Sequence, residues 1–255
     1  MHTLKIGILK DMHKQLKKYS ILLKKDIGIW EYTKGMFLGD SYEMEDFKGE
    51  IKTGDIWYAG YDSAHFFKAS FTVPEEMDGK ELRAKFQVGG EALVKCNGKY
   101  ISGCASRESL LDRTEVAIGV HKAGEVLNFE IEATVDSMYF CDEAMDGAKY
   151  QECRFGDTYI YVADTESEGY FIDIEVAFDA LNFIKDEYIH AKVYAAIDDS
   201  MHLVDYDFSE SEVRESIAKA RKLYLERIAA INWSAQSKVM LTGHSHIDVA
   251  WLWRI

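Results

Sequence analysis

The chain has 255 residues, 47% hydrophobic and 29% charged, and this balance excludes a disordered protein. Its 44 acidic and 30 basic residues give a net charge of −14, which argues against nucleic acid and anionic membrane as partners and favours neutral or cationic ligands. No apolar run reaches the roughly 20 residues of a bilayer span, and residues 1–9 are too short and too interrupted for a signal peptide. We therefore expect a cytoplasmic protein.

Residues 1–29 are predicted to form an N-terminal amphipathic helix. The apolar residues Ile8, Met12, Leu16, Tyr19 and Leu23 recur at intervals of three or four, which is the spacing of one helical face. Lysines fill the opposite face, as expected where a helix meets water.

Residues 30–165 are predicted to form an all-β sandwich. Their runs of β-branched and aromatic residues are short and are separated by glycines. Asn97 and Gly98 favour a tight hairpin, because both central residues of such a turn need positive φ angles. The predicted strands cover residues 67–73, 82–88, 92–96, 99–101 and 126–133.

The cysteines and several aromatic residues of this segment can be explained without a functional site. The cysteines match no metal-binding spacing, and we expect free thiols at Cys96, Cys104, Cys141 and Cys153. Trp57, Tyr58 and Tyr61 could stack on sugar, although core packing is the commoner role of such residues in a sandwich.

Residues 166–235 are predicted to form a helical connector of three helices. Ile174, Phe178, Leu181 and Ile184 follow helical spacing, and a second helix with Val193 and Ala196 comes next. Ser209 and Glu212 form the sequence pattern of a capping box, so the third helix should begin there.

Residues 236–255 combine a short buried-strand run with a dense polar cluster. His244, His246 and Asp248 occupy alternate positions directly after the strand, so in extended backbone their side chains project to one side. Imidazole nitrogens and a carboxylate suit a divalent metal such as zinc. The apolar residues at 251–253 and 255 have no following segment to pack against, and we expect a fragment.

Two stretches resemble a known family. TGHSHIDVAWLWR, residues 242–254, resembles the entry to the catalytic domain of the family 38 glycoside hydrolases, the α-mannosidases. VGGEALVKCNGK at 88–99 and FTVP at 71–74, with Trp57 and Asp62, resemble the jelly-roll domain that precedes it in the cytosolic and bacterial branch. The resemblance implies a multidomain chain: a galactose-binding-like jelly-roll sandwich, a helical connector, and the first strand of a truncated α/β barrel at 236–255.

The resemblance also implies an activity and its site residues. His246 and Asp248 would bind one Zn²⁺ per complete site, Trp251 would pack against mannose, and His244 would support the ligands. The reaction would be retaining hydrolysis of terminal α-mannosyl residues of an oligosaccharide. The nucleophile is expected beyond Ile255, so this fragment alone should be inactive. The resemblance leaves open a homo-oligomer of the full-length protein.

Two alternatives remain from the sequence. An amidohydrolase-like metal hydrolase would use His244 and His246 as a ligand pair, but it gives no reason for Asp248 or the aromatic residues after it. A non-catalytic carbohydrate-binding or assembly sandwich would make the terminal motif a remnant.

Overall fold

The computed structural model describes residues 2–60, 63–107, 111–135 and 150–232. They belong to two compact units. The helical unit comprises the residues up to Leu22 and those from Ala163 onward, and the β unit comprises the residues from Leu23 to Val162. Each unit is considered by itself.

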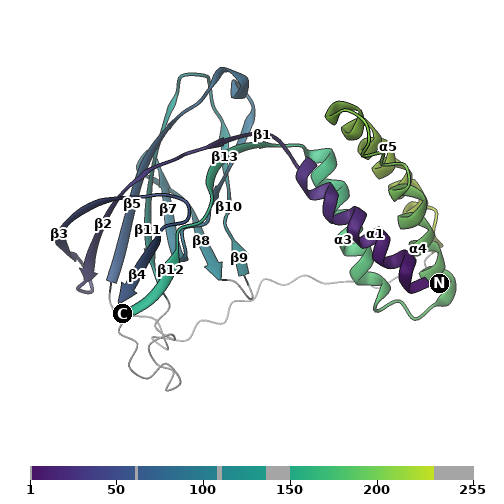
Figure 1. Cartoon of the computed structure of the whole chain (residues 1–255), viewed down its shortest axis with the longest axis horizontal. Coiled ribbons are helices and arrows are strands. Elements are labelled where there is room, and N and C mark those ends of the chain that lie inside the picture. The colour runs from purple at the N-terminus through teal and green to yellow at the C-terminus, as the bar shows by residue number, and fades with distance from the viewer. Residues whose placement is uncertain (1, 61–62, 108–110, 136–149, 233–255) are drawn as a thin grey trace. The chain divides into compact units, whose positions relative to one another are not determined.

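The β unit is a sandwich with a seven-stranded sheet on one side (Figure 1). In spatial order this sheet contains β3 (Tyr42–Ile51), β2 (Trp30–Phe37), β5 (Ser63–Thr72), β11 (Val126–Thr134), β7 (Gly90–Cys96), β8 (Lys99–Arg107) and β9 (Leu111–Arg113). The facing sheet contains β1 (Ile21–Asp26), β13 (Thr158–Ala163), β6 (Glu81–Phe86) and β10 (Glu115–Val120). A separate pair joins β12 (Tyr150–Arg154) to β4 (Ile56–Gly60), and a 3₁₀ turn spans Glu75–Met77.

Alternation along the strands creates the core between the two sheets. In β11, Leu127, Phe129 and Ile131 are buried and alternate with more exposed residues, since successive side chains point to opposite faces. Phe86 of the smaller sheet packs edge-to-face against Trp30 and Phe129 of the larger one, with ring centroids 6.0 and 5.1 Å apart. The predicted sandwich is therefore confirmed.

The predicted hairpin between β7 and β8 is present. Asn97 and Gly98 have φ angles of 48° and 76°, and Cys96 lies opposite Lys99 in the antiparallel ladder. Each predicted strand of the sandwich corresponds to an observed one.

The helical unit contains α1 (His2–Leu16), α3 (Thr165–Leu181), α4 (Glu187–Met201) and α5 (Glu210–Ala229), with a 3₁₀ turn at Lys17–Tyr19. The three connector helices begin at caps: Asp164 and Asp186 accept backbone N–H bonds at α3 and α4, and the predicted capping box of Ser209 and Glu212 starts α5. Their apolar faces enclose a core that includes Tyr170 and Ile217. None of the helices described is long and apolar enough to cross a membrane.

The prediction of one helix over residues 1–29 is wrong in two respects. The helix ends at Leu16, and Leu23 lies in β1, where pairing with β13 stabilises extended backbone. Ile8 is 54% exposed while Leu9 is 1% exposed, because the buried face runs through Leu9, His13 and Leu16. The predicted barrel strand at 239–241 lies outside the described residues.

Candidate functional site

The predicted metal site lies outside the described residues. This holds for His244, His246, Asp248 and Trp251, so their roles stay predictions. Within the described ranges, no group of three or more His, Cys, Asp and Glu side chains is arranged to hold a metal ion.

A groove lies on the outer face of the seven-stranded sheet, and we call it the sheet groove. It encloses about 440 Å³. Its apolar lining includes Tyr42, Met44, Phe66, Leu93 and Tyr100, and its charged lining is Lys68, Lys95, Glu130 and Glu132. These side chains come from β3, β5, β11, β7 and β8, and Thr33 of β2 also lines the groove, so that six strands build the surface.

The edge strand β3 supplies one wall of the sheet groove. The pairing of β2 with β3 shifts register between Thr33 and Gly35. A Cβ atom at Gly35 would lie 2.9 Å from the Glu43 carbonyl oxygen and 3.0 Å from Met44 Sδ, so glycine is what permits this close approach. Met44 thereby covers Gly35 at the edge of the groove.

Tyr42 is held across the sheet face. Its ring packs edge-to-face against Phe66 with centroids 5.2 Å apart, and its hydroxyl donates a hydrogen bond to Glu132 on β11. Burial, followed by this bond to Glu132, raises the pKa of Tyr42 above its ordinary value, so the hydroxyl stays neutral at physiological pH. The contact joins an edge strand to the centre of the sheet.

The charged residues of the sheet groove balance one another. Lys68 and Glu130 lie opposite each other on neighbouring strands and form an ion pair at 3.0 Å. Lys95 Nζ lies 4.6 Å from the centroid of the Tyr100 ring. Two lysines and two glutamates thus line a surface without net charge on a chain of net charge −14.

A buried polar cluster lies on the opposite, core-facing side of the same sheet. His65 is 1% exposed, and hydrogen bonds link its Nδ1 to the Tyr32 hydroxyl at 2.8 Å and its Nε2 to the Ser63 hydroxyl at 3.0 Å. Burial, and secondarily Lys34, lowers the pKa of His65 to about 4, so the imidazole is neutral. Both of its nitrogens are bonded within the protein, which makes the cluster structural.

The aromatic residues considered for sugar stacking separate in the structure. Trp57 is 1% exposed, and its Nε1 donates to the Val88 carbonyl at 2.7 Å, so core packing is confirmed for this residue. Tyr58 is 55% exposed on β4 and does not line the sheet groove, and Tyr61 lies outside the described residues. The two tyrosines that do line the groove, Tyr42 and Tyr100, carry no local sequence signal.

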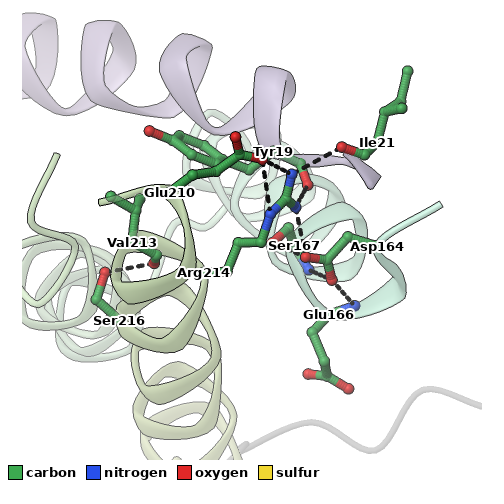
Figure 2. Close-up of polar contacts among 9 residues, drawn as sticks. All are labelled: Tyr19, Ile21, Asp164, Glu166, Ser167, Glu210, Val213, Arg214 and Ser216. Atoms are coloured by element: carbon green, nitrogen blue, oxygen red, sulfur yellow. Dashed lines mark hydrogen bonds and ion pairs between the residues drawn. The ribbon is translucent and has the colours of Figure 1, made fainter. Parts of the chain in front are cut away.

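Figure 2 shows the main polar junction of the helical unit, around Arg214 of α5. The guanidinium donates to the Tyr19 carbonyl, to the Ile21 carbonyl at 2.8 Å and to the Asp164 carboxylate at 2.7 Å. It also pairs with Glu210 at 2.7 Å. Although burial opposes ionisation of Asp164, hydrogen bonds from Ser167 and Arg214 hold the pKa of its carboxyl below the ordinary value. These partners of the Arg214 guanidinium are all backbone carbonyls or carboxylates of the protein itself, so the role of this junction is structural.

The cysteines described by the structure carry thiols outside any disulfide bond, as predicted. Cys104 and Cys153 are buried and Cys96 is half-buried, while Cys141 lies outside the described residues. Burial raises the pKa of Cys104 to about 11 and that of Cys153 to about 12, which keeps both protonated and unreactive.

Comparison with known proteins identifies the sandwich. Residues 39–159 match the family model of the α-mannosidase jelly-roll domain, which spans most of the β unit. The sandwich is therefore similar to the α-mannosidase jelly-roll domain. Alpha-mannosidase G of Dictyostelium discoideum is 24% identical over 220 residues, which cover 83% of this chain and 19% of that protein. The resemblance to the α-mannosidases is thereby confirmed, and the chain spans about a fifth of the length of this relative.

Solved structures with some similarity include two β-glucuronidases. The Faecalibacterium prausnitzii β-glucuronidase aligns with 55% of this chain and 31% of its own, at a TM-score of 0.36 and 14% identity. The Ruminococcus gnavus β-glucuronidase aligns with 57% of this chain and 31% of its own, at a TM-score of 0.37 and 14% identity. These values are too low to support any inference about function.

Proposed function

We propose that this chain is part of a zinc-dependent retaining α-mannosidase that removes terminal α-mannosyl residues from oligosaccharides. The observation that carries the proposal is the order of parts along the chain. An α-mannosidase jelly-roll domain is followed by helices α3 to α5 and then, from residue 242, by the motif that resembles the catalytic entry of the family.

The donor set of the motif fits zinc. His246 offers a neutral imidazole nitrogen and Asp248 a carboxylate oxygen, both of which are ordinary zinc ligands. A bound zinc ion would supply Lewis-acid chemistry by holding and polarising sugar hydroxyls. Trp251 would stack on the apolar face of the mannose ring, where an aromatic side chain excludes water and orients the sugar.

The remaining chemistry of a retaining glycosidase needs two carboxyl groups, one as nucleophile and one as acid and then base. In the proposed enzyme the nucleophile follows Ile255. The 255-residue chain should therefore not hydrolyse a chromogenic α-mannoside. Zinc-dependent turnover by this chain that is lost in His246→Ala would contradict that assignment.

The test uses the longer protein with its zinc content and its turnover measured together. Asp248→Ala should lower both the bound zinc and the hydrolysis of p-nitrophenyl α-mannoside, the latter by about a hundredfold or more, because a metal ligand is lost. The matched control is Asp46→Ala, which removes an exposed carboxylate on β3 and should leave both unchanged.

Two results would contradict the proposal. The first is stoichiometric zinc with wild-type turnover in Asp248→Ala. The second is loss of zinc in His244→Ala but not in Asp248→Ala, which would favour the amidohydrolase-like ligand pair.

A further inference from the structure

The sheet groove combines exposed apolar side chains with polar ones, as a sugar-binding site does. Tyr100 is 63% exposed, Leu93 and Met44 are each 49% exposed, and Tyr42 is 37% exposed. A pyranose presents C–H faces that pack on such surface, with hydroxyls at its rim that need both donors and acceptors. The lysines and glutamates around these side chains supply both kinds of group.

The charge balance indicates a neutral ligand. Lys68 and Lys95 offset Glu130 and Glu132, so the sheet groove has no excess charge with which to select an anion or a cation. The strongly acidic chain around it would further disfavour an anionic ligand. A polyol needs no counter-charge, and it can accept from lysine ammonium groups and donate to carboxylates.

The groove is held in shape before any ligand arrives. Tyr42 is fixed between the Phe66 ring and the Glu132 carboxylate, and Lys68 is fixed by Glu130. Side chains that are already ordered lose little entropy on binding. The volume of about 440 Å³ falls within the roughly 300 to 1,000 Å³ range of ligand sites.

A second depression extends the surface beyond the sheet groove. A second depression of about 540 Å³ on the same sheet includes Lys68 and Glu130, which also line the sheet groove. It adds Ser70 and Asn128, whose side chains are joined by a hydrogen bond at 2.8 Å. Unlike the sheet groove, this depression has an excess of negative charge from Glu31 and Glu50, which disfavours an anionic ligand. Two adjoining depressions suit an extended oligosaccharide better than a monosaccharide.

A protein partner fits the same surface less well. The fully buried centre of a protein interface is depleted of charged residues. Here the Lys68 and Glu130 pair lies where the two depressions meet, and a protein docked over it would have to desolvate both charges.

We propose that the outer face of the seven-stranded sheet binds a neutral oligosaccharide, with Tyr100 and Tyr42 packing on sugar rings and Lys68, Lys95, Glu130 and Glu132 bonding to hydroxyls. The choice of mannose as the first probe rests on the proposed function, but the binding chemistry does not. The assay uses the 255-residue chain and measures no hydrolysis, so failure of this proposal is distinguishable from failure of the α-mannosidase assignment.

Isothermal titration calorimetry with an α-linked mannotriose, with maltotriose and with an anionic trigalacturonate tests the proposal. We expect saturable binding of at least one neutral trisaccharide and none of the anionic one. Tyr100→Ala should weaken the binding about tenfold, whereas Tyr100→Trp should retain it, because a second aromatic ring can replace the first. The matched control is Tyr58→Ala, since Tyr58 is similarly exposed on the same sandwich but outside the sheet groove.

Three results would overturn the proposal. The first is the absence of saturable heat with either neutral trisaccharide at millimolar concentration. The second is an equal effect of Tyr58→Ala and Tyr100→Ala, which would place the binding elsewhere. The third is concentration-dependent self-association that Tyr100→Ala abolishes, which would assign this face to a second copy of the chain.

Discussion

Replacing Arg214 should destabilise the helical unit more than its position on a helix surface suggests. The side chain is 15% exposed, and Arg214→Met would remove all donors of its guanidinium while keeping most of its apolar stem. The backbone carbonyls of Tyr19 and Ile21 would lose their Arg214 donor, and the Asp164 carboxylate, 14% exposed, would lose its cationic partner.

The size of the effect follows from the burial of each partner. Each carbonyl left without this donor costs about 1 kcal/mol, and the half-satisfied Asp164 costs about 1 to 2 kcal/mol. Asp164 keeps its bonds from Glu166 and Ser167, which limits its share. The pair with Glu210, which is 69% exposed, adds only a few tenths of a kcal/mol. We therefore expect Arg214→Met to lower the free energy of unfolding by about 3 to 4 kcal/mol, and Arg214→Lys by about half as much.

Urea unfolding followed by circular dichroism at 222 nm measures this loss, because the helices dominate that signal. The matched control is Arg227→Met on the same helix, where Arg227 is 56% exposed and pairs with Asp199 at 3.0 Å. It should cost less than about 0.5 kcal/mol. Equal stability of the two variants, or a loss below about 1 kcal/mol in Arg214→Met, would refute the reasoning.

Three further predictions concern the β unit. His65 has a pKa of about 4 in the folded protein against 6.5 when free, so its contribution to stability is complete above pH 6.5 and is lost as the pH falls toward 4. The free energies of unfolding at pH 7.5 and pH 5.0 should therefore differ by about 2 kcal/mol because of this residue. His65→Gln should remove that part of the pH dependence. Gly90→Ala should lower the free energy of unfolding by about 2 kcal/mol more than Gly98→Ala. Both glycines have positive φ, but only at Gly90 would a Cβ atom lie 2.3 Å from a backbone oxygen of β11. Equal losses of stability in thermal unfolding would contradict the clash. Under native conditions Cys96 should be alkylated by iodoacetamide faster than buried Cys153, whose pKa is about 12, and mass spectrometry showing the reverse order would contradict the burial of Cys153.

Local patterns in the sequence predict the centre of the sandwich well. Alternation identifies β5 and β11, and Asn97 with Gly98 identifies the hairpin, because each signal lies within a few residues. β3 has no such signal, since nearly all its side chains are exposed and its place is set by pairing with β2. Apolar spacing predicts a helix at Leu23, because the spacing does not reveal that the segment pairs with β13.

Of the two candidate sites, the metal motif can be predicted from the sequence and the sheet groove cannot. The metal motif is contiguous, so residue spacing and family resemblance suffice to predict His246 and Asp248. The sheet groove depends on residues from six strands, and Tyr42 and Glu132 meet across 90 positions of sequence. Only the strand order and the register shift at Gly35 bring them together.

The anomeric form of the first product tests the proposed α-mannosidase most directly. Proton NMR during hydrolysis of p-nitrophenyl α-mannoside by the longer protein would follow mannose as it is released, before mutarotation. A retaining mechanism predicts that α-mannose appears first and β-mannose only later. Release of β-mannose first, or no hydrolysis by a zinc-loaded longer protein, would contradict the account.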